Sequence, residues 1–134
     1  MKKLTALLLI VFTVASLCAC TYVELNADIT VNARFINEDN SVDAPLSAED
    51  AAVISKLFNG KALYEETPPC SFTADFALTI GGSTYCIAND GCPFVYLLEK
   101  EEYFLLSNEE HEKLKELMAE YGVVFESSEL SEIK

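Results

Sequence analysis

The chain has 134 residues, five of them cysteines, and carries 22 Asp and Glu against 9 Lys and Arg, a formal net charge of -13. This length suits one domain of ordinary size and leaves no room for two well-built cores. So large an excess of acid excludes a general nucleic-acid binder and disfavours electrostatic docking on anionic lipid, because both need clustered Lys and Arg. A hydrophobic content of 51% also excludes a disordered acidic chain.

Residues 1–19 have the composition of a secretory signal peptide. Met1-Lys2-Lys3 supplies a basic start, and an apolar run of fourteen residues extends from Leu4 to Leu17. A transmembrane helix needs about 20 residues, so a permanent membrane span is the weaker alternative. We therefore expect residues 1–19 to be cleaved and residues 20–134 to remain as a single domain.

The end of this segment, Leu17-Cys18-Ala19-Cys20, resembles the lipobox of bacterial lipoproteins. The resemblance implies cleavage before Cys20 and a diacylglycerol on the Cys20 thiol. Two or three acyl chains, such as palmitate, would then hold the chain on the extracytoplasmic face of the cell membrane. An ordinary secretory signal with Cys20 as a free thiol is the alternative. Cleavage removes Lys2 and Lys3 but no acid, so the net charge of the mature chain becomes -15.

Apolar and polar residues alternate strictly from Val23 to Phe35. This alternation predicts a β-strand with one face on a core and the other in water, which is typical of antiparallel sheets. We expect a long strand here, at an edge of the sheet where it could contact a partner. Because the ordered pattern begins so soon after Cys20, the tether between lipid and domain is expected to be very short. The polar residues from Asn37 to Asp43 predict a turn.

Two expected helices begin with the same Leu-Ser-x-Glu pattern. Ser47 is the expected N-cap of the first helix, Asp50 should complete a capping box with it, and Asn59-Gly60 should end the helix. Ser107 and Glu110 are expected to form the same box at the start of the second helix. The repeat is typical either of an internal duplication or of two well-capped helices that use the same chemistry independently.

Strand patterns fill the region between the helices. Phe72 to Ile80 and Thr84 to Ala88 flank Gly81-Gly82, which predicts a β-hairpin in which Ile80 pairs with Ser83. Residues 94–98 and 103–106 predict a second pair, and residues 123–125 a last short strand. The expected fold is α+β, with one antiparallel β-sheet of about four to six strands and two α-helices packed on one face.

Beyond Cys20, the mature chain has three cysteines, Cys70, Cys86 and Cys92, which can form one disulfide. In the register of the Gly-Gly hairpin, Cys70 and Cys92 come opposite each other if a bulge shifts the pairing by one residue. Cys86 lies farther along the hairpin, opposite Ala77 and on its more polar side. We therefore expect a Cys70–Cys92 disulfide with Cys86 free; three reduced thiols are the alternative.

Motifs for chemistry are scarce. His111 is the single histidine, and a thiol-dependent hydrolase or redox protein would have to pair it with Cys86. The sequence contains no Cys-x-x-Cys, His-Glu-x-x-His, Gly-x-Ser-x-Gly or phosphate-loop motif, so we expect no catalytic residue, cofactor or metal site. The segment from Asp39 to Asp43 only faintly resembles a calcium loop, since it lacks the glycine and the terminal Glu of an EF-hand.

The layout from the lipobox through the Phe-rich hairpin and Asp90-Gly91-Cys92 to the second helix looks like that of small uncharacterised lipoproteins of Gram-positive bacteria. That resemblance supplies no activity. The architecture is also similar to that of inhibitor modules with β-lactamase-inhibitor-like and cystatin-like folds. We expect a lipid-anchored, non-enzymatic binding or inhibitor-like protein whose partner, besides the membrane, is another envelope protein. The alternative is the thiol-dependent enzyme built on Cys86 and His111.

Overall fold

A computed structural model describes residues 21–26, 28–68 and 70–125; the expected signal peptide and the lipobox at Cys20 lie outside the described residues. Six strands form one antiparallel sheet in the order β2-β1-β3-β4-β5-β6. The elements, in chain order, are β1 (Val31–Ile36), β2 (Ser41–Pro45), α2 (Ala48–Phe58), β3 (Phe76–Ile80), β4 (Ser83–Ile87), β5 (Phe94–Leu97), β6 (Glu102–Leu105) and α3 (Asn108–Glu120).

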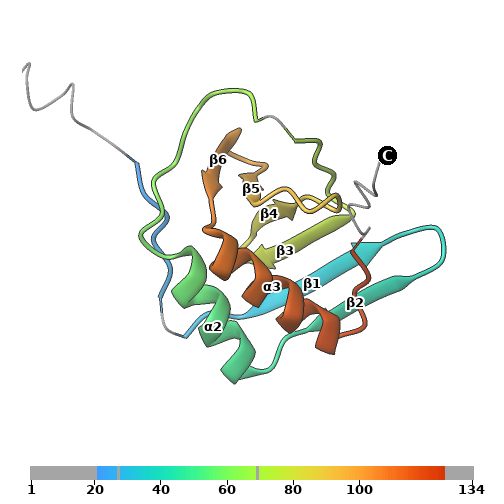
Figure 1. Cartoon of the computed structure of the whole chain (residues 1–134). Helices are drawn as coiled ribbons and strands as arrows, with labels where there is room; N and C mark the ends of the chain where they lie inside the picture. The colour runs from blue at the N-terminus through green and yellow to red at the C-terminus, as the bar shows by residue number, and fades with distance from the viewer. Residues whose placement is uncertain (1–20, 27, 69, 126–134) are drawn as a thin grey trace, which may run out of the picture.

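Both helices lie on the same face of the sheet (Figure 1). We call this face the inner face and the opposite one the outer face. The inner-facing side chains of the strands and the buried side chains of α2 and α3 form one hydrophobic core. The expected α+β fold, an antiparallel sheet with two helices on one face, is confirmed.

Phe58 of α2 links this helix to two strands of the core. Its ring is fully buried, with its centroid 5.6 Å from that of Tyr85 on β4 and 5.1 Å from that of Phe104 on β6. Leu114 and Met118 place α3 in the same cluster. Burying side chains of this size contributes about 1.5–3 kcal/mol each. Apolar contacts with the inner face of the sheet therefore keep both helices packed on it.

The helix starts were correctly predicted. Ser47 and Ser107 are the N-caps of α2 and α3, and Ser107 forms a complete capping box with Glu110. Asp50, one methylene shorter than Glu, does not close its own box: the hydroxyl of Tyr121 accepts from the Ser47 N–H at 2.9 Å and donates to Asp50 Oδ2 at 2.5 Å. The residue that ends α3 thus completes the cap of α2 and links the two helices.

The hairpin of β3 and β4 has the predicted register. Ile80 pairs with Ser83, and Ala77 comes opposite Cys86. Gly81 and Gly82 have φ angles of +56° and +83°, as two-residue hairpin turns commonly demand of their central residues. The turn therefore fixes which side chains of β4 face each side of the sheet.

The long strand expected from Val23 to Phe35 is wrong in extent and position. Strand β1 starts only at Val31, and it lies between β2 and β3 rather than at an edge. Val23 instead pairs with the residues that follow α2: its N–H donates to the Lys61 carbonyl at 2.9 Å, and its carbonyl accepts from the Gly60 N–H at 2.8 Å. The alternating pattern correctly predicted that Val23 is buried. It could not predict the pairing partner, because alternation depends only on which side chains face the core.

The turn expected from Asn37 to Asp43 is shorter in the structure, because residues from Ser41 onward form an additional strand, β2, which was not expected. β2 forms one edge of the sheet and pairs with β1 from Ser41 to Pro45. Its side chains are exposed or only half-buried in alternation, so an edge strand of this kind lacks the apolar run that would have identified it. The segment 123–125, expected as a last strand, is irregular.

Candidate functional site

The expected disulfide between Cys70 and Cys92 is present, with Cα atoms 6.5 Å apart. The expected reason for it is wrong, because neither cysteine lies in a strand. β3 begins only at Phe76 and β4 ends at Ile87, so the bridge ties the segment before β3 to the loop between β4 and β5. Because it joins two segments outside the strands, the bulge expected in the hairpin plays no part in it.

Cys86 is the free thiol, as expected, but its surroundings are not the polar ones predicted. Its neighbours Tyr85 and Ile87 face the inner core, so Cys86 faces outward between them. It is nevertheless fully buried, as is Ala77 opposite it. Burial, with a smaller contribution from Glu99, raises the pKa of the Cys86 thiol to about 11.

The structure does not bring Cys86 and His111 together. His111 lies on α3 next to the core residues Leu114 and Met118, which places it on the inner side of the sheet. Its Nε2 is buried with no hydrogen-bond partner within the described part of the chain. Burial and nearby Lys115 lower the pKa of His111, partly offset by Glu112. A sheet thus separates the thiol from the imidazole that a thiol-dependent enzyme would need.

The outer face of β5 and β6 carries an aromatic strip, which we define as Tyr64, Phe72, Phe94, Tyr96 and Tyr103. Tyr96 and Tyr103 are cross-strand partners. Phe72 stacks on Tyr96 with ring centroids 5.4 Å apart, while Tyr103 is 5.3 Å from Phe94 and 5.5 Å from Tyr64. Tyr64 reaches the strip through two backbone hydrogen bonds to Tyr103. Ring contacts and the pairing of Tyr96 with Tyr103 link all five residues, and both helices lie on the opposite face of the sheet (Figure 1).

The other half of the outer face is polar. On β1 and β2, the Asn32 amide donates to Asp43 at 3.2 Å, and the Arg34 guanidinium pairs with Asp75 at 3.3 Å. These groups satisfy one another across the strands. The outer face therefore divides into a polar half, whose side chains bond to one another, and an aromatic half, whose rings are partly buried except for the exposed Tyr64.

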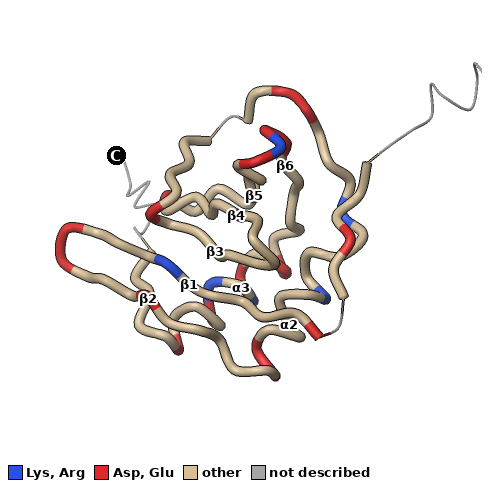
Figure 2. The backbone as a smooth tube through the Cα atoms, turned by 180° about the vertical axis from the view of Figure 1, so that it is seen from behind, with Lys and Arg blue, Asp and Glu red and all other residues tan. Residues whose placement is uncertain are grey.

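A hollow of about 290 Å³ opens beside the aromatic strip. It is lined by Glu65, Glu66, Thr67, Pro68, Tyr96 and Glu101. Seen from behind, the acidic segment at Glu65-Glu66 runs next to the acidic turn that precedes β6 (Figure 2). Glu99, in that same turn, has a structural role, since its carboxylate accepts from the Thr84 N–H at 2.8 and 3.0 Å. Glu101 has no such partner among the described residues, and its φ of +54° is the only positive value at a described non-glycine residue.

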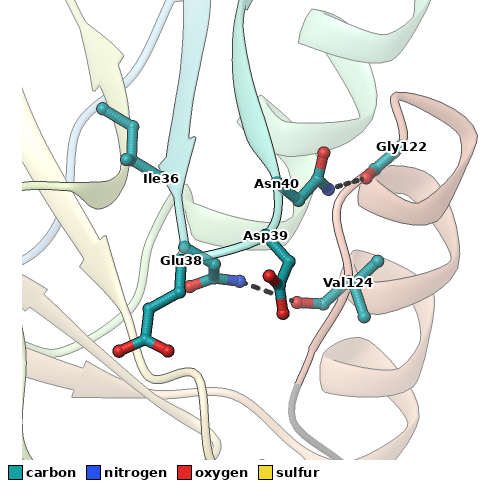
Figure 3. A pocket seen from close by; sticks show the side chains of 7 residues that line it. Ile36, Glu38, Asp39, Asn40, Gly122 and Val124 are labelled. Atoms are coloured by element: carbon teal, nitrogen blue, oxygen red, sulfur yellow. Dashed lines mark hydrogen bonds between the residues drawn. The ribbon is translucent and has the colours of Figure 1, made fainter.

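A larger hollow, of about 880 Å³, lies at the tip of the β1–β2 hairpin, where Glu38, Asp39 and Val124 line it (Figure 3). Its amide side chains serve the fold: Asn40 donates to the Gly122 carbonyl at 2.6 Å and Asn37 to the Val124 carbonyl at 3.3 Å. These two bonds hold the segment after α3 against the hairpin. Within residues 21–26, 28–68 and 70–125, no group of three His, Cys, Asp or Glu is arranged to hold a metal ion.

No family model matches the chain, and no curated protein or solved structure matches it either. Among the helices that the structure describes, none is long and apolar enough to cross a membrane. Sequence patterns did not identify the aromatic strip or the hollow beside it, since Tyr64 of the strip and Glu65 and Glu66 of the hollow lie in a segment without periodicity. The available signal was the presence of Tyr96 and Tyr103 at outward positions of their strands.

Proposed function

We propose that this chain is a lipid-anchored protein of the bacterial cell envelope, held on the extracytoplasmic face of the membrane through Cys20. The support is the basic and apolar start of the chain and the resemblance of Leu17-Cys18-Ala19-Cys20 to a lipobox. A Cys20→Ala variant expressed in a bacterium should move from the membrane fraction to the soluble fraction. Retention of that variant in the membrane would contradict the lipid anchor.

The domain itself acts as a non-enzymatic binding module, and the aromatic strip is the observation that supports this function. Tyr and Phe are enriched in protein interfaces because their rings offer a large contact area with little conformational freedom to lose. Tyr64 is 50% exposed, and Leu105, two residues after the bridge partner of Tyr64 on the outer side of β6, is 48% exposed. Contiguous exposed apolar surface of this kind is typical of interaction sites.

The thiol-dependent alternative lacks support in the geometry. Cys86 and His111 lie on opposite sides of the sheet, and a thiol pKa of about 11 is the reverse of what a nucleophile needs. At pH 8, only about one Cys86 thiol in a thousand would be ionised. The folded protein should therefore resist iodoacetamide at Cys86; rapid alkylation of Cys86 below pH 9 would revive the enzyme reading.

The binding function can be tested in living cells with a photo-crosslinking residue. p-Benzoylphenylalanine at Tyr64 or Leu105 should yield a covalent adduct of one defined mass with an envelope protein, because both side chains are exposed on the outer face. The matched control places the same residue at Glu116, which is exposed on α3. Equal adducts at all three positions, or none at Tyr64 and Leu105, would contradict a binding site on the outer face.

A further inference from the structure

We propose that the hollow beside Tyr96 binds the lysine or arginine side chains of a basic, extended segment of a protein partner. This inference rests on the proposed binding function and deepens it by naming the chemistry of the partner. The hollow joins one aromatic ring to three carboxylates, those of Glu65, Glu66 and Glu101. The hollow at the hairpin tip has Glu38 and Asp39 but no aromatic residue in its lining, and the one beside Lys100 has a single acid, Glu24.

The aromatic part of the hollow suits a cation. The face of a tyrosine ring attracts ammonium and guanidinium groups through its negative π-electron density. Tyr96 is held in place by its stack on Phe72 and by pairing with Tyr103 across β5 and β6. The Cys70–Cys92 bridge restrains the segment that carries Phe72. The ring therefore needs little reorganisation to receive a ligand.

The charge around the hollow favours the same occupant. The three ion pairs of the described residues use Asp75, Glu110 and Glu112, so none of them neutralises an acid of the hollow. Lys100, next to Glu101 in sequence, lines a different hollow together with Tyr22 and Leu97. A cationic side chain would reduce the repulsion among the three carboxylates, and the net charge of the chain would steer it there.

The shape of the surface favours a peptide segment over a small cation. The acids are not grouped closely enough to hold a metal ion in the described part of the chain. From Tyr96 the aromatic strip continues through Tyr103 to Tyr64, and Leu105 extends the apolar surface on the outer side of β6. A chain with Lys or Arg in the hollow could lay its neighbouring residues along these rings.

The test uses a fluorescein-labelled (Lys-Gly)4 peptide and fluorescence anisotropy on the full chain in detergent micelles. The triple variant Glu65→Gln/Glu66→Gln/Glu101→Gln should weaken binding at least tenfold. The control triple variant Glu49→Gln/Glu116→Gln/Glu120→Gln removes the same charge from exposed positions on α2 and α3. It should weaken binding about twofold, which is the general electrostatic effect alone. Equal losses in the two triple variants would overturn the proposal.

Tyr96→Leu provides a second, independent variant, because leucine keeps apolar contacts while removing the ring. We expect a loss of about fivefold in affinity for (Lys-Gly)4, and a lysine-acetylated form of the peptide should not bind to any of the proteins. Unchanged affinity of Tyr96→Leu, or binding of the acetylated peptide, would contradict a cation site. If Tyr64 and Leu105 crosslink to a partner in cells while the acid variants bind normally, the proposed function stands and this inference fails.

Discussion

The two faces of the sheet use aromatic residues in opposite ways. On the inner face, Phe104 is completely buried, and its ring packs against the equally buried Phe58 of α2. On the outer face, Tyr103 is half-buried and Tyr64 is half-exposed, and neither is covered by a helix. Because side chains of a strand alternate between faces, one short strand supplies both the core and the surface. The comparison teaches that the inner rings are used fully in packing and the outer rings only in part, which leaves some of the outer ring surface accessible to a partner.

The largest expected effect is a difference in stability between variants of two neighbouring residues of β6, Phe104 and Tyr103. Phe104→Ala should lower the free energy of unfolding by about 3–5 kcal/mol, because it leaves a cavity among fully buried rings. Tyr103→Ala, on the outer face, should cost about 1 kcal/mol, from its contacts with Phe94 and Tyr64. Urea unfolding of both variants measures the difference. Equal losses would show that the outer strip is a second core rather than a surface.

The disulfide should have the next largest effect. Its cysteines are separated by 22 positions in the chain, and closing a loop of that size contributes about 3 kcal/mol by restricting the unfolded chain. The double variant Cys70→Ser/Cys92→Ser should unfold at correspondingly lower urea concentration. Dithiothreitol should lower the urea midpoint of the parent protein to that of the variant and leave the variant unchanged. If dithiothreitol does not change the midpoint of the parent protein, the bridge does not stabilise the fold.

A smaller effect is expected where the two inner helices meet. Tyr121→Phe removes the hydroxyl that bridges the Ser47 N–H and Asp50. The loss of two hydrogen bonds, one to a carboxylate, should cost about 1–2 kcal/mol in the free energy of unfolding. Tyr22→Phe is the matched control, because Tyr22 is 54% exposed and should tolerate the change. A cost no greater than that of the control would contradict the role of Tyr121 in capping α2.

The smallest effect concerns pH and His111. Burial and Lys115 place the pKa of His111 below its ordinary value of 6.5 in the folded protein, with Glu112 acting in the opposite direction. The unfolded chain therefore binds a proton at higher pH than the folded one. The stabilising contribution of neutral His111 is complete above pH 6.5 and falls as the pH decreases towards the folded pKa. His111→Gln should flatten the dependence of unfolding free energy on pH between 7.5 and 5.5; an unchanged slope would contradict this assignment.

Local signals in the sequence predicted most of the fold. Ser107 with Glu110 and the pair Gly81-Gly82 act through neighbouring residues, and both occur as expected. Longer-range pairing could not be inferred: Val23 alternates like a strand residue but bonds to the chain after α2. The outer surface was missed for the same reason, because the hollow at Tyr96 forms only when Glu65 and Glu66 come next to the turn before β6.

The most direct test of the outer face as the binding surface is an NMR titration of the ¹⁵N-labelled full chain with (Lys-Gly)4. The account predicts that backbone amide shifts concentrate at Glu65, Glu66, Tyr96, Glu101 and Tyr103, while exposed positions of α2 and α3 stay unchanged. Shifts centred on the helices, or on the hairpin tip at Glu38 and Asp39, would contradict it.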